Sequence, residues 1–257
     1  MSTPRFDRLT WPEVAQAIER GSGIILPVGA IEQHGPHLPV DTDSFLADSI
    51  ATAAASAHDL LVAPMIPYGY RSRPLSGGGP DFPGTVSLSG ELMINVLSHV
   101  LSEFAAQGFR RFLIYSWHME NQNFVYEAAF KAFRDLSSVK TVVMESPFAN
   151  LAPETMSALF GNEFPGWPAE HASTLETSLM LHLRPDAVDM EKAVDDRVEY
   201  APAYELIPAP KTMTTRSGVM ARATLGTEQK GAMAFQDIVQ RLEDVLTTEF
   251  PELAGTE

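Results

Sequence analysis

The amino-acid sequence predicts an α/β fold, with helices on both faces of a mostly parallel sheet in an α/β/α sandwich. Four short apolar runs, at residues 23–28, 60–64, 112–115 and 140–144, have the near-continuous hydrophobicity of strands that are buried on both faces. Amphipathic segments of helical period separate these runs, and such alternation places successive strands parallel through right-handed crossovers. The 257 residues contain no Pro/Ser-rich linker and no charge block, so we expect one domain over residues 1–257.

Cap and turn residues mark the first three helices. Residues 10–13, TWPE, have the form of a capping box with proline in the first turn, which predicts a helix that Gly21 closes. Thr42-Asp43 matches an N-cap for a helix over residues 44–57. Ser89 is expected to cap a third helix, which Gly108 ends. Its predicted apolar stripe is Leu92, Val96, Val100 and Phe104.

The remaining helices are predicted from apolar residues at helical spacing, over residues 124–136, at 154–160, from about 173, and from 227 to 251. The expected inward residues are Ala128, Ala129 and Phe133 in the first of these, and Met233, Ile238, Leu242 and Leu246 in the last. Residues 194–226 lack periodicity and contain several prolines. We interpret them as a surface excursion, long enough to cover a neighbouring subunit's site.

Composition restricts the compartment and the partners. With no cysteine, disulfides and thiolate metal sites are excluded, so any metal must bind N and O ligands, as Zn, Mn and Fe do. The formal net charge of −15 argues against nucleic acid, whose binding needs Lys/Arg contacts to phosphates. No apolar run approaches the length of a membrane span, and MSTPRFDRLT lacks a signal-peptide core. We therefore expect a soluble cytoplasmic protein.

Metal-type ligands follow two of the predicted strands. After residues 23–28 come Glu32, His34 and Asp43, and after residues 112–115 come His118 and Glu120. Taken alone, Asp43 could be only a helix cap and Glu32 a solvated loop carboxylate. The second loop favours a metal site, because its His118 and Glu120 have the same spacing as Glu32 and His34 in the reverse order. Both loops lie at carboxyl ends of parallel strands, where open α/β folds bind ligands.

These two imidazoles and three carboxylates suit two divalent ions, each held by one His and one Glu, with Asp43 bridging them. The charges support this count. Two divalent cations bring four positive charges, the carboxylates supply three negative ones, and a bridging hydroxide would supply the fourth. Such a hydroxide is also the nucleophile that a site of this kind generates.

Two other segments carry candidate substrate contacts. Residues 67–84 form a long loop rich in Gly and Pro, in which Ser76 and the glycines at 77–79 could present N–H groups to an oxygen-bearing ligand or simply be flexible. This loop lacks the lysine of a nucleotide-binding P-loop. Further on, Trp167 and Glu170 accompany His171, an aromatic wall beside a titratable group. Glu176, on the following helix, is left open between a role behind the site and an ordinary exposed position.

Taken together, these motifs resemble the creatininase (creatinine amidohydrolase) family. The similar stretches are LPVGAIEQHGPHLPVDTD at residues 26–43, YGY with SGGG and FPGT at 68–85, HMEN at 118–121, and GWPAEHASTLETSLML at 166–181. They span nearly the whole chain in the expected order. The resemblance implies a dinuclear metal amidohydrolase of α/β/α fold, assembled as a homohexamer, which converts creatinine to creatine.

Carried over position by position, the resemblance implies that the metal ligands are Glu32, His34, Asp43, His118 and Glu120. It implies substrate contacts for Ser76, Trp167 and His171, with His171 as the proton shuttle, so His171 and Glu120 are the predicted catalytic side chains. The chain departs from the family at Met119, where creatininase has Tyr, and at Pro168, where it has Asp. Residues 146–148 also lack the family's flap Trp.

These departures change the substrate wall and leave the predicted metal centre intact, so the reaction class is predicted more firmly than the substrate. Hydrolysis of a small cyclic amide is the leading hypothesis. If the protein is a related enzyme with another substrate, the alternatives are a formamide, a peptide-like amide, a lactone or a cyclic ketone. Outside enzymes, the alternatives are a metal-responsive binding protein, which needs no hydroxide or shuttle, and a purely structural oligomer.

Overall fold

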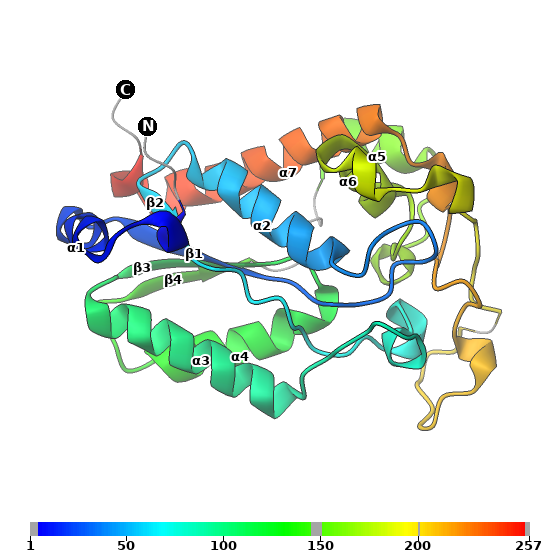
Figure 1. The fold of residues 1–257 in the computed structure, drawn as a ribbon, viewed down its shortest axis with the longest axis horizontal. Helices are drawn as coiled ribbons and strands as arrows, with labels where there is room; N and C mark the ends of the chain where they lie inside the picture. The colour runs from blue at the N-terminus through cyan, green and yellow to red at the C-terminus, as the bar shows by residue number, and fades with distance from the viewer. Residues whose placement is uncertain (1–4, 145–150, 200, 255–257) are drawn as a thin grey trace.

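The computed structural model describes residues 5–144, 151–199 and 201–254, and it has the predicted α/β architecture (Figure 1). Four parallel strands form one sheet in the order β2-β1-β3-β4. Their bounds are β1 Gly23–Val28, β2 Leu60–Val62, β3 Arg111–Ser116 and β4 Lys140–Val143. Three of them lie within the predicted apolar runs, and β3 extends its run by one residue at each end. The central strands β1 and β3 pair from Ile24 with Phe112 to Val28 with Ser116, so they end side by side.

Helices cover both faces of the sheet, as Figure 1 shows for α3 and α4 on one side and α2 and α7 on the other. One core contains side chains of α2 (Thr42–Ala55), α5 (Pro153–Phe160), α6 (Thr174–Leu183) and α7 (Glu228–Glu249). The other contains side chains of α1 (Trp11–Arg20), α3 (Gly90–Gln107) and α4 (Gln122–Phe133). The helices predicted from the sequence are thus confirmed, with shifts of a few residues at their ends.

Alternation along the strands explains the two cores. Ile25 and Leu113 are fully buried against the helices of the first core. Their neighbours Ile24, Leu26 and Phe112 point through the other face and are equally buried in the second core. Because side chains alternate across a strand, only an apolar run without polar interruptions can serve both faces.

Two predicted helix faces were only partly right. In α3, Phe104 is buried as predicted, but Leu92 and Val96 are 55% and 41% exposed, and Met93, Leu97 and Leu101 are buried in their place. Both stripes have helical spacing, so periodicity could not choose between them; packing against α4 and the sheet decided it. Met233 of α7 is likewise 43% exposed, whereas its predicted partners Ile238, Leu242 and Leu246 are buried.

The loops that follow β1 and β3 gather at one end of the sheet, together with the glycine-rich loop and residues 194–226 (Figure 1). The described part of residues 194–226 holds only two short 3₁₀ turns, at Lys211–Met213 and Ala223–Leu225, in agreement with its lack of periodicity. Its reach over a neighbouring subunit stays a prediction. Among the described residues, no helix is long and apolar enough to cross a membrane.

Candidate metal centre and substrate pocket

The two predicted ligand loops meet beyond the ends of β1 and β3. The N–H of Trp117 donates to the carbonyl of Val28 at 3.2 Å, so the loops leave the sheet together. Helix α2 begins at Thr42, two residues earlier than expected, which places Asp43 in its first turn and not at its cap. From there the Asp43 carboxylate faces both loops. The side chains of Glu32, His34, Asp43 and His118 are almost fully buried.

One group of potential metal ligands consists of Glu32, Asp43 and His118. The Nδ1 atom of His118 lies 3.3 Å from Oε2 of Glu32 and 3.1 Å from Oδ2 of Asp43. The other ring nitrogen, Nε2, lies 2.9 Å from the carbonyl oxygen of Tyr70 and donates to it. That hydrogen bond fixes the ring so that Nδ1 faces the two carboxylates.

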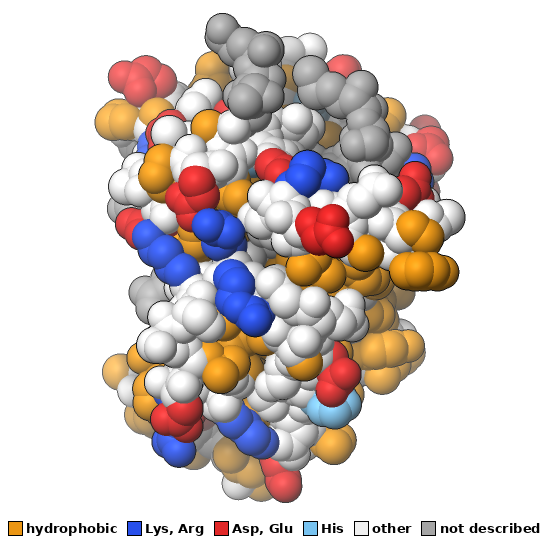
Figure 2. Space-filling view, turned by 90° about the vertical axis from the view of Figure 1, so that its left-hand side faces the viewer, with side chains coloured by type: hydrophobic (Ala, Val, Ile, Leu, Met, Phe, Trp, Pro, Cys, Tyr) orange, Lys and Arg blue, Asp and Glu red, His pale blue; other side chains and the backbone are white. Residues whose placement is uncertain are grey.

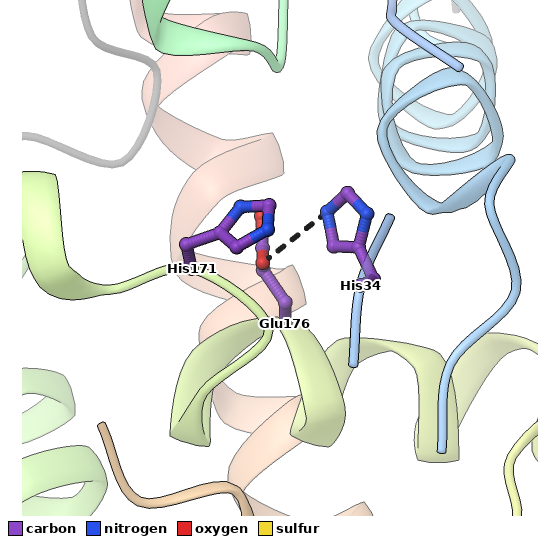
Figure 3. A group of neighbouring side chains, drawn as sticks. All are labelled: His34, His171 and Glu176. Carbon is purple, nitrogen blue, oxygen red and sulfur yellow. Dashed lines mark ion pairs between the residues drawn. The ribbon is translucent and has the colours of Figure 1, made fainter. Parts of the chain in front are cut away.

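The second group consists of His34, His171 and Glu176 (Figure 3). The Nε2 atom of His34 lies 3.5 Å from Oε2 of Glu176 and 3.3 Å from Oδ1 of Asp43. The rings of His34 and His171 are 4.5 Å apart between centroids, and Figure 3 shows Glu176 rising between them from the start of α6. Asp43 therefore presents one oxygen to each group, which is the position predicted for a bridge.

Within the part of the chain that the structure describes, three buried atoms of these groups have no hydrogen-bond partner: Oε2 of Glu32, Nε2 of His34 and Oδ2 of Asp43. An unpartnered buried carboxylate oxygen costs a large desolvation free energy unless a cation or donor compensates it. Converging N and O lone pairs of this kind fit a divalent ion. The described residues of both groups thus fit divalent ions, although the groups include His171 and Glu176 and leave out the predicted ligand Glu120.

The buried carboxylates of the site need positive charge beside them. Burial raises the pKa of Glu32. Burial also acts to raise the pKa of Asp43, but His34 and His118 outweigh it and hold that pKa far below its usual range. Burial lowers the pKa of His118, yet Glu32 and Asp43 raise it to about 10. Cationic imidazoles thus balance the buried carboxylates, a role that divalent cations at the same position would fill.

A cavity opens onto these ligands. Asp43, His118 and Glu176 line it, and so do all five predicted substrate contacts: Ser76, Met119, Trp167, Pro168 and His171. The indole of Trp167 is held edge-on against Phe164, with centroids 4.7 Å apart. Glu170 also lines the cavity, and burial together with the nearby Glu176 raises its pKa to about 8. Because its Oε1 accepts from the N–H of Leu175 at 2.8 Å, Glu170 also caps α6.

The glycine-rich loop packs against the ligands. Ser72 donates a hydrogen bond to Oε1 of Glu32, and the N–H of Gly79 donates to Ser72 at 2.8 Å. A Cβ atom at Gly79 would lie 2.4 Å from Oε1 of Glu32, so only glycine permits this approach. The glycine-rich loop is thus in direct contact with Glu32.

Glu176 is the residue that sequence reasoning left undecided. Its Oε1 accepts from Nε1 of Trp117 at 3.0 Å and its Oε2 from the N–H of Ala172 at 2.7 Å. Its place five residues after His171, in the first turn of a helix, was the available signal. Glu120, a predicted ligand, belongs to neither group: its Oε2 is 3.5 Å from Nε2 of His118, and Ser76 donates to its Oε1. The predicted loss of the flap Trp, at residues 146–148, lies outside the described residues.

Comparison with known proteins identifies the family of this chain. The creatininase family, described as creatinine amidohydrolase, matches residues 7–246. A creatinine amidohydrolase of Pseudomonas putida is 34% identical over 249 residues, which cover 95% of this chain and 96% of that protein. The chain belongs to the creatininase family. It is therefore a hydrolase of the metal-dependent amidohydrolase type.

Solved structures of the family have the same fold. A creatininase described as its Mn form matches with a TM-score of 0.93 and 33% identity, over 97% of this chain and all of that one. A mutant creatininase complexed with creatine matches with a TM-score of 0.92, also at 33% identity, with 97% and 100% of the two chains covered. The predicted fold class is thereby confirmed.

More distant relatives have other substrates. A 3-dehydro-scyllo-inosose hydrolase of Thermotoga maritima is 28% identical, over 96% of this chain and 84% of its own. A mycofactocin precursor peptide peptidase of Mycolicibacterium smegmatis is also 28% identical, over 90% and 87%. Membership of the family thus establishes a hydrolase but leaves several substrate classes open.

Proposed function

We propose that this protein uses two divalent metal ions to hydrolyse the amide bond of a small cyclic substrate, with creatinine as the leading named candidate. The observation that carries the proposal is that two groups of potential ligands share Asp43 at the floor of one cavity. In this proposal Glu32, Asp43 and His118 would hold one ion, and His34, Asp43 and Glu176 would hold the other.

The charge count predicted from the sequence still applies to this arrangement. The carboxylates of the two groups are Glu32, Asp43 and Glu176, so Glu176 takes the place that the prediction gave to Glu120. Ions bound here would polarise the scissile carbonyl and lower the pKa of a water molecule. Zinc and manganese suit these N and O ligands best, and iron is a further candidate.

The remaining side chains supply binding and proton transfer. His171 is proposed to hold and deliver the proton that the leaving nitrogen needs, since it lines the cavity beside the second group. Glu120, with Ser76 bound to it, faces the same cavity and is proposed as a second acid/base group, while its part as a ligand stays a prediction. The indole of Trp167 is proposed to stack on a flat ring.

Two wider properties are also proposed. Assembly as a homohexamer is proposed from the family resemblance, and a cytoplasmic location is the expectation from the sequence analysis. Family membership sets aside the binding-protein and structural-oligomer alternatives, because members of this family are metal-dependent enzymes.

A different small substrate is the second candidate function, and Met119 and Pro168 favour it. Both residues line the cavity, where the family pattern has a phenol and a carboxylate. Loss of a hydrogen-bonding partner in a buried site costs roughly 1–3 kcal/mol, so two such losses could lower kcat/KM for creatinine by several powers of ten. A formamide, peptide-like amide, lactone or cyclic ketone would then be the better substrate.

The test is a hydrolysis screen of cyclic amides, lactones and formamides, with Zn- or Mn-loaded protein and with the double variant Met119→Tyr, Pro168→Asp. Efficient turnover of creatinine by the wild type would support the leading candidate. Weak turnover that rises in the double variant would support the second. No hydrolysis of any amide by either protein would overturn the amidohydrolase proposal.

A further inference from the structure

Gln33 lies between the predicted ligands Glu32 and His34 and is 5% exposed, yet neither the ligand groups nor the cavity include it. Its side-chain Nε2 donates to two backbone carbonyls, those of Gly77 and Gly218, each at 2.9 Å. Its Oε1 accepts from the N–H of Gly35 at 2.9 Å. These three partners settle which end of the amide is nitrogen and which is oxygen.

The two carbonyls belong to segments that are far apart in the sequence. Gly77 lies in the glycine-rich loop, 44 residues from Gln33, and Gly218 lies in the segment 194–226, 185 residues away. Gly218 has a φ of +84°, and a Cβ atom there would lie 1.7 Å from Oε1 of Gln33. One buried amide thus joins two loops whose described helices are only short 3₁₀ turns.

The same amide contacts His171, whose Nε2 lies 2.9 Å from Nε2 of Gln33 and 2.9 Å from the backbone oxygen of Gln33. The two amide hydrogens already have acceptors in the carbonyls of Gly77 and Gly218. The arrangement that satisfies every group has the imidazole Nε2–H donating to the backbone oxygen of Gln33. Segment 194–226 adds a further tie, since the N–H of Met220 donates to the carbonyl of His171 at 3.1 Å.

We propose that Gln33 is a positioning residue of the hydrolytic site. Its amide ties the glycine-rich loop and the segment around Gly218 to the ligand loop, and its backbone oxygen orients the ring of His171. The effect on catalysis rests on the proposed function, in which His171 transfers a proton. The tie between the loops does not, and it is measurable without substrate.

The experiment compares wild type with Gln33→Met, which keeps the length of the side chain but removes its donor and acceptor. In hydrogen exchange, the amides of residues 77–79 and 218–220 should exchange roughly 5–30-fold faster, because the variant loses the hydrogen bonds that close both loops. Elemental analysis should still find the wild-type metal content. Gln240→Met is the matched control, since Gln240 is exposed on α7 and bonds only to Asp244.

Catalysis is read with creatinine, or with whichever compound of the screen is hydrolysed fastest. Gln33→Met should lower kcat by up to about 10²-fold, because a small misplacement of an acid/base group is costly, and should change KM much less. In a His171→Ala background, Gln33→Met should cause no further loss of kcat. Independent, multiplying losses would show that Gln33 does not act through His171 and would overturn that part of the proposal.

A second pair of variants keeps the test decisive if Gln33→Met does not fold. Gly218→Ala places a Cβ against Gln33, whereas Gly161→Ala also replaces a glycine of positive φ, at φ +57°, but its new Cβ would meet no described atom within 4 Å. Only Gly218→Ala should speed exchange at residues 77–79. Unchanged exchange at residues 77–79 in both Gly218→Ala and Gln33→Met would refute the tie between the loops, whatever the substrate screen returns. Faster exchange at these residues, together with no hydrolysis of any compound by the wild type, would contradict the proposed function and leave the tie standing.

Discussion

The two groups of potential ligands differ in where their residues come from. Glu32, Asp43 and His118 lie in the segments that follow β1 and β3, which are neighbours in the sheet. The other group takes His34 from the first of these segments, but His171 lies just before α6 and Glu176 lies in its first turn, and α6 does not directly follow a strand of the sheet. Topology alone brings the first group together, whereas the second depends on how α6 packs.

Most of the partners that hold the ligands lie in other segments than the ligands themselves. His118 is held by the backbone carbonyl of Tyr70 and Glu32 by Ser72, both in the glycine-rich loop. Glu176 is held by the indole of Trp117, in the loop after β3, and by the N–H of Ala172, and His171 is held by Gln33, in the loop after β1. We therefore expect the first group to respond to changes in the glycine-rich loop, and the second to changes at Trp117, at Gln33 or at the start of α6.

Removing the shared residue should have the largest effect. Asp43→Asn should lose both ions, because one carboxylate oxygen faces each group. Activity should fall to background, and the melting temperature should drop, since ions bound to the native state stabilise it. Elemental analysis and calorimetry measure both. Full metal occupancy in this variant would mean that Asp43 bridges nothing.

Removing one unshared carboxylate should cost one ion. Glu32→Gln should empty the first group and Glu176→Gln the second, each leaving about half of the wild-type metal content, because an amide is a far weaker ligand than a carboxylate. Glu120→Gln is the informative companion, since Glu120 was predicted as a ligand but lies in neither group. We expect it to retain both ions and lose kcat; loss of an ion would restore the prediction from the sequence.

Removing His171 should lower kcat and leave the metal content unchanged. His171→Ala should keep the fold and both ions but lower kcat by roughly 10²–10⁴, the usual contribution of a positioned acid or base. Steady-state kinetics with parallel metal analysis give the answer. If His171→Ala loses one ion, His171 is a metal ligand of the second group.

The smallest effect is expected from Trp117, which holds a potential ligand of the second group in place. Trp117→Phe removes the indole N–H that donates to Oε1 of Glu176 while keeping an aromatic ring in the core. Loss of such a partner typically weakens metal binding by roughly 10–100-fold. Competition with a chelator should reveal one weakened ion and one unchanged. Equal weakening of both ions would show that the two groups do not respond separately.

The sequence by itself determined the order of strands and helices, because apolar runs and cap residues are local features. It also determined the loops that bear Glu32, His34, Asp43, His118 and Glu120. Parallel strands that end at one edge bring such loops together, provided that the strands are neighbours, as β1 and β3 are. Ser76, Trp167 and His171 were candidate contacts from the sequence, the resemblance to creatininase gave them substrate roles, and all three line the cavity.

Only the tertiary structure decided the rest, because the deciding contacts join residues whose separation in the chain carries no periodic signal. The stripes of α3 through Leu92 and through Met93 have equal spacing, and packing buried the second. Glu176 became a candidate ligand through its approach to His34, 142 positions away in the printed sequence. Gln33 acquired its partners Gly77 and Gly218 in the same way, since backbone carbonyls can satisfy a buried amide only where the fold has already brought them.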